Sequence, residues 1–501
     1  MNEENGLINI INFNNISYKY PDTEVNALKE ISFCVYSGEF IAIMGENGCG
    51  KTTLCKLING IIPHFYGGKL TGSITVDGIC TKESTVAKLA HKAGMVFDDP
   101  DVQLFTSTVR DEAAFGPENL LLPVQEIIDR VEYALSVTGL TGFEDRSPVT
   151  LSGGEKQRLC IAAIIAMKSK IIVLDEPLCR LDPDGADEFL SVLKRLKEKY
   201  QITVIMAAHE SEKMAEYADR VCILKQGRIA ALDTAKNIFE NSELLESTGI
   251  RPINRRNSHR GTEAQSFLNN SSSTSVSTVS PCLRVSNLCY MYPNGGGIEN
   301  INLAIYENDF IAITGKNGCG KTTLLKNITG LLRPCSGDIF LHGRNIKEMT
   351  IGDISKEVGF VMQNPDTQLF TDSVYNEVAF ALKNKRLPKM EIKKRVEEAL
   401  DTVGLSKPED FPFALCKTER TKIVIACVLA MGCKIIIFDE VDVGNDYRGC
   451  LEIMSITNDL HKKGFTIIFV THNMFLVDDF AHRVIRLDKT GIISDTRKQY
   501  E

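Results

Sequence analysis

The feature that most constrains this chain is that its sequence is written twice. The segment GENGCGKTT at 45–53 returns as GKNGCGKTT at 315–323. Three more segments return in the same order: FDDPDVQLF (97–105) as MQNPDTQLF (362–370), IIVLDEP (171–177) as IIIFDEV (435–441), and TVIMAAHE (203–210) as TIIFVTHN (466–473). A repeat of this length and order indicates two copies of a whole domain rather than a solenoid of short units.

Each copy mixes short β-branched runs with amphipathic helical patterns, which predicts an α/β fold. We expect the first domain over 7–252 and the second over 282–501. The segment between them, 253–281, is rich in Ser, Asn and Thr and lacks apolar periodicity. It is therefore predicted to be a flexible linker. About 30 residues of this kind reach roughly 30 Å on average, which is enough for the two domains to pair with each other.

Composition narrows the classes of function. Lys and Arg number 57 against 65 Asp and Glu, a net charge of −8, and this acidic balance argues against nucleic acid as the main partner. No apolar run approaches the roughly 20 residues that cross a bilayer, and the start MNEENGLINI lacks the order of a signal peptide. The 15 cysteines form no C-x-x-C pair and no Cys/His cluster. We therefore expect a reducing cytosol and neither a zinc nor a disulfide framework.

The repeated GENGCGKTT and GKNGCGKTT segments have the spacing of phosphate-binding loops. Each follows an apolar run and precedes a helical pattern, so its glycines let backbone N–H groups close around phosphate oxygens at a helix N-terminus. Lys51 and Lys321 are expected to reach the β- and γ-phosphates, and Thr52 and Thr322 to bind Mg²⁺. The predicted nucleotide-binding residues of the two loops are Gly45, Glu46, Asn47, Gly48, Cys49, Gly50, Lys51, Thr52, Thr53, Gly315, Lys316, Asn317, Gly318, Cys319, Gly320, Lys321, Thr322 and Thr323.

Further apolar runs end in acidic residues or precede a histidine. IIVLDE and IIIFDE each read as a buried strand whose two carboxylates lie at its carboxyl end. Asp175 and Asp439 are expected to complete the magnesium shells, and Glu176 and Glu440 to polarise an attacking water. The histidines that follow the next apolar run are predicted to sense the γ-phosphate: His209 and His472.

Tyr20 and Tyr292 each precede a phosphate loop within a Y-x-Y-P segment. Two interpretations stay open for them. The rings either stack on the base of the nucleotide, as an adenine platform, or pack at the end of a strand.

The LSGGE segment at 151–155 is the most specific pattern. Ser152 can cap a helix while Glu155 reaches back to it, and Gly153 and Gly154 let bare backbone approach a phosphate. A phosphate loop, then LSGGEKQR, then a strand ending in Asp-Glu, then a histidine resembles the ATP-binding-cassette (ABC) ATPases over nearly the whole chain outside the linker. The resemblance implies two tandem cassettes, each a RecA-like α/β core with a helical subdomain and a small antiparallel β region, that use ATP and Mg²⁺.

The resemblance also implies that the cassettes pair head to tail, so that each ATP site joins one cassette's phosphate loop to the other's signature segment. We call site one the pairing of 45–52 with 415–419, and site two the pairing of 315–322 with 151–155. In site two the resemblance places Gln363 beside the magnesium and the attacking water. It gives Ser152, Gly153, Gly154 and Glu155 the role of the signature that acts in trans.

The departures from the family pattern fall on one site. The sequence LCKTE at 415–419 replaces LSGGE, and Asp98 occupies the place of the family's glutamine. The second copy's VGNDY (443–447) departs from the family's D-loop, which the first copy keeps as CRLDP (179–183). All three belong to site one. We therefore expect site two to hydrolyse ATP, and site one to hold ATP with little turnover, its Lys417 still able to neutralise phosphate charge.

Within the family, DPDVQLF (99–105), NPDTQLF (364–370) and DEAAFGPENL (111–120) resemble the ATPases of energy-coupling-factor (ECF) importers for vitamins and cobalt-type metal ions. That resemblance implies a transmembrane coupling subunit, a substrate-capturing membrane protein, and a peripheral place on the cytoplasmic face of the cell membrane, with ATP hydrolysis coupled to transport. Two alternatives stay open: a fused sugar-importer ATPase, and a soluble ABC protein of translation or DNA repair. The transported substrate is not encoded in this chain.

Overall fold

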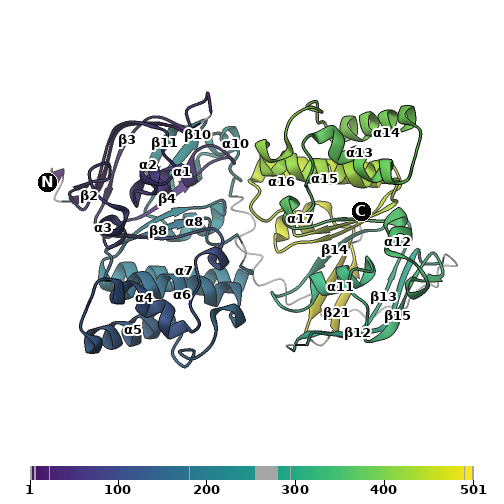
Figure 1. Cartoon of the computed structure of the whole chain (residues 1–501), viewed down its shortest axis with the longest axis horizontal. Coiled ribbons are helices and arrows are strands. Elements are labelled where there is room, and N and C mark those ends of the chain that lie inside the picture. The colour runs from purple at the N-terminus through teal and green to yellow at the C-terminus, as the bar shows by residue number, and fades with distance from the viewer. Residues whose placement is uncertain are drawn as a thin grey trace. The chain divides into compact units, whose positions relative to one another are not determined.

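Figure 1 shows the computed structural model of the chain, which describes residues 3–4, 7–21, 23–179, 181–253, 280–293, 295–489 and 491–498. The chain divides into two compact units, 1–259 and 260–501. Each unit contains one copy of the repeat. The predicted linker over 253–281 lies outside the described residues except for its first residue and its last two.

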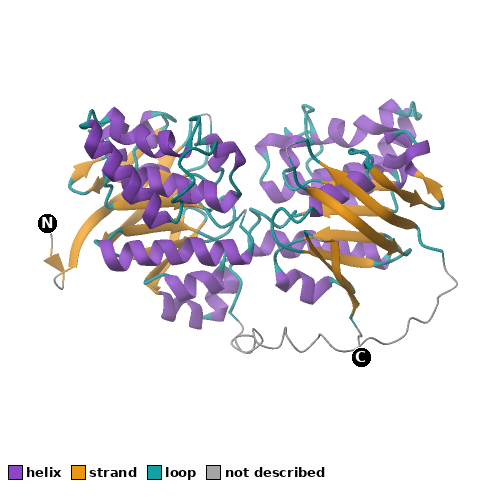
Figure 2. Cartoon of the chain, turned by 90° about the horizontal axis from the view of Figure 1, so that it is seen from below, coloured by secondary structure: helices purple, strands orange, loops and turns teal. Residues whose placement is uncertain are grey.

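The first unit has an antiparallel sheet, a six-stranded sheet and a set of helices (Figure 2). The antiparallel sheet contains β1 (Glu3–Glu4), β2 (Leu7–Lys19), β3 (Leu28–Tyr36), β5 (Lys69–Val76) and β6 (Ile79–Cys80). The second sheet has the order β11 (Arg228–Thr234), β10 (Arg220–Lys225), β4 (Phe40–Met44), β9 (Thr203–Ala207), β8 (Ile171–Asp175) and β7 (Ala93–Val96). The helices are α1 (Lys51–Ile58), α2 (Ile61–His64), α3 (Val86–Ala90), η1 (Pro100–Val102), α4 (Val109–Asn119), α5 (Val124–Thr138), η2 (Pro148–Thr150), α6 (Gly153–Ala166), α7 (Pro183–Tyr200), α8 (Ser211–Tyr217), α9 (Ala235–Glu240) and α10 (Ser242–Ser247).

The second unit repeats this plan. Its antiparallel sheet has the order β13 (Gly297–Ile305), β12 (Leu283–Met291), β15 (Ser336–Leu341) and β16 (Arg344–Asn345). Its six-stranded sheet has the order β17 (Val358–Val361), β18 (Ile435–Asp439), β19 (Thr466–Val470), β14 (Phe310–Thr314), β20 (Arg483–Asp488) and β21 (Gly491–Arg497). The helices are α11 (Lys321–Ile328), η5 (Ile346–Glu348), α12 (Ile351–Glu357), η6 (Pro365–Thr367), α13 (Val374–Asn384), α14 (Lys389–Thr402), η7 (Pro412–Ala414), α15 (Lys417–Met431), α16 (Tyr447–Lys462) and α17 (Met474–Phe480).

The central strand β4 shows why the six-stranded sheet is buried on both faces. Phe40, Ala42 and Met44 belong to the core that contains α6 and α7, whereas Ile41 and Ile43 belong to the core that contains α1 and the antiparallel sheet. A parallel strand covered on both faces is a continuous apolar run rather than an alternating one. The predicted α/β fold, with a helical part and a small antiparallel part in each unit, is confirmed.

Strand register brings the predicted site residues to one edge of each sheet. In the first unit β4, β9 and β8 run parallel, and Ala207 of β9 lies between Ile43 of β4 and Asp175 of β8. In the second unit Ile313 and Asp439 flank Val470 in the same way. The carboxyl ends of neighbouring parallel strands meet at one edge, so the phosphate loop, the acidic pair and the histidine of each unit converge there.

The described helices include none that combines the length and the apolar character needed to cross a membrane.

Candidate nucleotide-binding sites

The two phosphate loops require their glycines for conformation and for space. Gly45 and Gly315 have φ of 146° and 152°, and a Cβ on either would lie 2.2 or 2.3 Å from a backbone carbonyl oxygen of Leu224 or Leu487. Any larger residue would push the loop off the neighbouring strand. The loops therefore keep their backbone N–H groups at the start of α1 and α11, where a phosphate would be bound.

The loop lysines are nearly buried and are held by the loops themselves. Lys51 Nζ donates to the Gly45 carbonyl oxygen at 3.0 Å, and Lys321 Nζ donates to the Gly315 carbonyl oxygen at 2.9 Å. Their ammonium groups also lie 3.5 and 3.6 Å from the carboxylates of Glu176 and Glu440, a distance that joins each loop to the end of the acidic strand. The site in each unit is thus a compact cluster of positive charge, carboxylate and backbone donors.

A hydroxyl and a carboxylate meet beside each lysine. Thr52 Oγ1 donates to Asp175 Oδ1 at 3.1 Å, and Thr322 Oγ1 donates to Asp439 Oδ1 at 3.2 Å. Burial and a neighbouring glutamate raise the pKa of Asp175 to about 7 and that of Asp439 to about 6. These are hard oxygen ligands of the kind Mg²⁺ takes, and a cation there would offset the cost of burying the carboxylate. The residues present therefore fit the predicted magnesium sites.

The glutamates lie next to the histidines in both units. His209 Nε2 is 2.9 Å from Glu176 Oε1, and His472 Nε2 is 3.3 Å from Glu440 Oε1. Burial alone would raise the pKa of Glu176, but the hydrogen bond and charge of His209 together with Lys51 lower it to about 2. The pKa of Glu440 is lowered against burial in the same way by His472 and Lys321. Both carboxylates are therefore held in the ionised form.

Backbone strain marks the same two glutamates. Glu176 and Glu440 have φ of 48° and 49°, in the left-handed region that residues other than glycine rarely adopt. Such conformations persist where the surroundings enforce them, and they cluster at functional sites.

The two sites differ at the second position after β7 and β17. Gln363 Nε2 donates to Glu440 Oε2 at 3.0 Å. In the first unit the equivalent residue is Asp98, which has no amide to donate and whose charge helps to raise the pKa of Asp175. Gln363, Glu440 and His472 thus lie together in the second unit, while their catalytic roles stay predictions.

Tyr20 and Tyr292 lie against the start of the loop helices. Tyr20 Oη is 3.0 Å from Thr53 Oγ1, and Tyr292 Oη is 3.3 Å from Thr323 Oγ1. Tyr20 also packs edge-on against Tyr66, with ring centroids 6.0 Å apart. These contacts place the rings beside the loops, and the adenine-stacking role stays a prediction.

The LSGGE segment forms the predicted cap of α6. Ser152 N donates to Glu155 Oε2 at 2.7 Å, and Glu155 N donates to Ser152 Oγ at 3.4 Å. Gly153 and Gly154 form the first turn of the helix. In the second unit Cys416 N still donates to Glu419 Oε2 at 3.1 Å, so the altered segment keeps the cap without its serine.

One ion pair in each unit was not predicted from the sequence. Lys156 of α6 pairs with Asp101 of η1 at 2.6 Å, and Arg420 of α15 pairs with Asp366 of η6 at 3.2 Å. Each ion pair joins the signature helix to the short helix that follows Asp98 or Gln363. A position-by-position comparison of the copies would have found it, because both keep a basic residue and an aspartate there.

Apolar side chains are exposed beside the same short helices. Phe105 packs edge-on against Phe115, with centroids 4.8 Å apart, and Phe370 packs against Phe380 at 4.7 Å. All four rings are among the exposed large apolar side chains.

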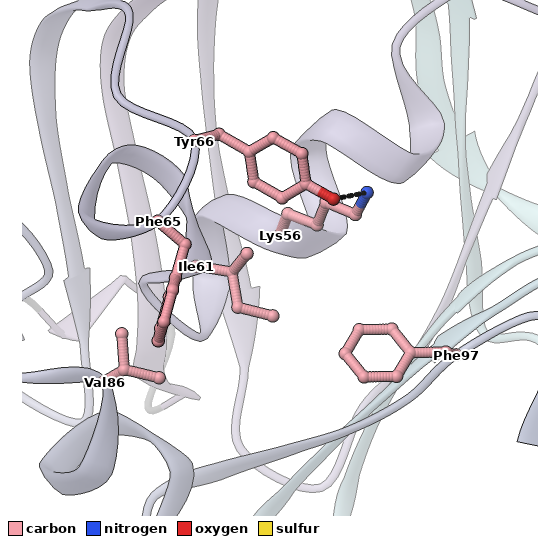
Figure 3. A pocket seen from close by; sticks show the side chains of 6 residues that line it. All are labelled: Lys56, Ile61, Phe65, Tyr66, Val86 and Phe97. Atoms are coloured by element: carbon pink, nitrogen blue, oxygen red, sulfur yellow. Dashed lines mark hydrogen bonds between the residues drawn. The ribbon is translucent and has the colours of Figure 1, made fainter. Parts of the chain in front are cut away.

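The first unit also has a pocket of about 420 Å³. Figure 3 shows Phe97 across the pocket from Phe65, and Tyr66 joined to Lys56 by a hydrogen bond of 3.1 Å. Its lining residues are Lys56, Ile61, Phe65, Tyr66, Val86 and Phe97. Phe97 directly precedes Asp98 in the sequence.

The chain was compared with known proteins. The sequence profile of the family described as "ABC transporter" matches residues 28–179 and 298–442. A protein of Caldanaerobacter subterraneus that is provisionally named an ABC transporter ATP-binding protein is 35% identical over 97% of this chain and 92% of its own length. A similarly named protein of Methanosarcina mazei is 35% identical over 97% of this chain and 88% of its own length. Among solved structures, cbiO1 of Clostridium perfringens, described as part of the ABC transporter complex cbiONQ, is 35% identical, with 48% of this chain and 95% of that chain covered and a TM-score of 0.43.

Proposed function

The chain belongs to the ABC transporter family, and on that premise we propose that it is the ATP-hydrolysing, energy-coupling subunit of a membrane importer of the ECF type. It is a tandem protein with two ATP-binding cassettes, one in each unit. On this proposal its cargo is a vitamin or a metal ion that a separate membrane protein captures. The head-to-tail pairing of the cassettes into site one and site two is part of the same proposal.

The observation that carries the proposed chemistry is the set of groups around Glu440. Gln363 donates to one of its carboxylate oxygens, and His472 lies beside the other. A carboxylate oriented in this way can accept a proton from an attacking water, while the amide and the imidazole fix its direction. Mg²⁺, held by Thr322 and Asp439, would neutralise charge on the β- and γ-phosphates.

Site one keeps the means to bind nucleotide but lacks groups that favour hydrolysis. Lys51 bonds to its own loop and Thr52 bonds to Asp175, as their counterparts do in the second cassette. Glu176, however, has no amide donor from Asp98, and the signature proposed to face this site has lost its serine and both glycines. We assign site one the role of holding ATP between the cassettes and site two nearly all of the turnover.

Attachment to a membrane is proposed to occur through protein contacts on the cytoplasmic face. The exposed phenylalanine pairs lie beside the short helices that follow Asp98 and Gln363, in both cassettes. The ion pairs from these helices to α6 and α15 would carry a movement at the docking surface to the signature segments. The partner is a transmembrane coupling subunit, whose cytoplasmic helices would cover the exposed rings.

The test is to purify the tagged full chain from membranes of its own host in mild detergent. We expect the chain in the membrane fraction, its release by alkaline carbonate, and co-purification of a polytopic membrane protein. Recovery only with ribosomes or DNA would contradict the proposal and favour a translation or repair ATPase. ATP hydrolysis by the recovered complex is then measured with candidate cargoes. Only the matching cargo should stimulate hydrolysis, which separates a vitamin or metal-ion importer from a sugar importer.

A further inference from the structure

The junction between the signature helix and the loop after the acidic strand is built differently in the two cassettes. In the first cassette it is apolar: Leu178, Leu181, Ala186 and Ala208 belong to the main core, and a Cβ on Gly154 would lie 3.5 Å from Leu181. The equivalent positions of the second cassette are all polar or sulfur-bearing: Thr418, Asp442, Asn445, Cys450 and Thr471.

These replacements bond to one another. Thr418 Oγ1 donates to Asn445 Oδ1 at 2.9 Å, and Asn445 Nδ2 donates to the Val441 carbonyl oxygen at 2.6 Å. Thr418 and Asn445 are each only 5% exposed. A buried polar group without a partner destabilises a fold, so each of the two residues needs the other.

Lys417 fits the same loop. Its Nζ donates to the Val443 carbonyl oxygen at 2.5 Å, so its ammonium points to a loop of its own cassette, unlike the phosphate contact that the sequence suggested. Gly444 has φ of 68°, and a Cβ there would lie 2.8 Å from Lys417 Nζ. The left-handed backbone at this position favours glycine, and the ammonium of Lys417 lies directly against it.

Residues outside α15 also contact the 441–446 loop. Thr471 Oγ1 donates to Asp442 Oδ2 at 2.6 Å, which joins the loop to the residue before His472. Cys450 Sγ lies 3.7 Å from the carbonyl oxygens of Asp442 and Asn445. Unrelated losses would leave such groups unpaired, whereas here changes in three separate segments complete one network.

We propose that Lys417 and Thr418 of the altered signature segment form a latch with Asn445 of the 441–446 loop, which fixes that loop on α15 in one conformation whether or not nucleotide is bound. Lys417 is then a positioning residue and makes no contact with phosphate. The consequence for site one rests on the proposed function, because only the proposed head-to-tail pairing places this loop there. A fixed loop would keep site one closed around its ATP through the cycle of site two.

The experiment measures amide hydrogen exchange in the purified full chain, with and without Mg²⁺ and a non-hydrolysable ATP analogue. In the parent, peptides covering 441–446 should exchange slowly and equally in both conditions. Lys417→Met should raise their exchange rate about tenfold by opening the loop locally, and leave the affinity for the analogue unchanged. Lys417→Arg should restore much of the protection. The matched control is Lys407→Met. It removes a surface lysine that pairs with Glu419 of α15 at 3.0 Å, and it should not change the exchange rate of the 441–446 loop.

A second pair of variants guards against misfolding. Thr418→Val and Asn445→Leu should each increase exchange at 441–446, and the double variant should exchange more slowly than either, because it rebuilds an apolar contact like that of Leu181. Unchanged exchange in Lys417→Met, weaker binding of the analogue in that variant, or additive effects in the double variant would overturn the latch. Equal hydrolysis at both sites, or absence of a membrane partner, would instead refute the proposed function and leave the exchange result standing.

Discussion

The two cassettes share the lysine and threonine contacts of the phosphate loop and differ around the signature helix. Thr52 and Thr322 bond to their aspartates at 3.1 and 3.2 Å. By contrast, Gly153 and Gly154 open α6 in the first cassette, whereas Lys417 and Thr418 open α15 in the second and bond to their own cassette. The groups that would bind nucleotide are thus present in both cassettes. The segment that would act on the other cassette's nucleotide is present in its family form in only one.

The largest expected effect comes from replacing one of the two glutamates, Glu440 or Glu176, with glutamine. Glu440→Gln should lower steady-state ATP hydrolysis by about a hundred- to ten-thousandfold, because it removes the proposed proton acceptor of the site to which we assign the turnover. Glu176→Gln is the matched control and should retain most of the activity. Phosphate release by the complex with its membrane partners measures both. Equal losses would contradict the asymmetry between the sites.

The next largest effect tests the pairing of the cassettes. Ser152→Ala should lower hydrolysis about a hundredfold, as loss of a donor to the developing charge does, although Ser152 lies in the first cassette. Cys416→Ala, the equivalent change in the second cassette, should alter it little. The same assay measures the pair. Unchanged turnover in Ser152→Ala would show that the signature of the first cassette does not complete site two.

A smaller effect is expected at the residue after the edge strand. Gln363→Ala removes the amide that bonds to Glu440 at 3.0 Å, and we expect about a tenfold fall in turnover from the loss of orientation, with little change in ATP affinity. Asp98→Gln should not raise turnover appreciably, because on the proposed pairing site one would still face an altered signature. A large gain from Asp98→Gln alone would mean that the signature matters less than proposed.

The smallest effect concerns docking. Phe105→Ala removes one of the exposed rings proposed to be covered by the coupling subunit and should weaken capture of the membrane partner about fivefold, since loss of an aromatic anchor costs about 1 kcal/mol or more. Ile493→Ala, an exposed apolar residue on β21, is the control and should capture the partner normally. Quantitative pull-down from detergent extract measures both. Equal capture by the two variants would place the partner elsewhere.

Much of this account could be predicted from the sequence because it depends on local chemistry. The glycines of the loops, the Asp-Glu ends of β8 and β18, and the Ser152–Glu155 cap each follow from spacing and residue type within a few positions. Parallel pairing then brings them together without further information. The composite character of the sites, in contrast, came from the family resemblance, and it stays a proposal.

The features that could not be predicted, the contact of Lys417 with Val443 and the pocket of the first unit, depend on side-chain direction and on chain segments far apart in sequence. The path of Lys417 to Val443 is set by the left-handed turn at Gly444, which lies 27 positions away from it in sequence. The pocket lined by Phe97 depends on Phe65 and Tyr66, in the connection that contains α2. The described connection between α11 and β15 contains no helix, so the repeat could not indicate the pocket.

The most direct test of the central claim is a single-turnover experiment on the full chain with its membrane partners, loaded with radiolabelled ATP and Mg²⁺ and freed of excess nucleotide. If site two turns over and site one only holds nucleotide, about half of the bound ATP should become ADP in one fast phase, and the other half should stay intact ATP. Conversion of all bound ATP in one phase, at one rate, would contradict the claim that the two sites differ.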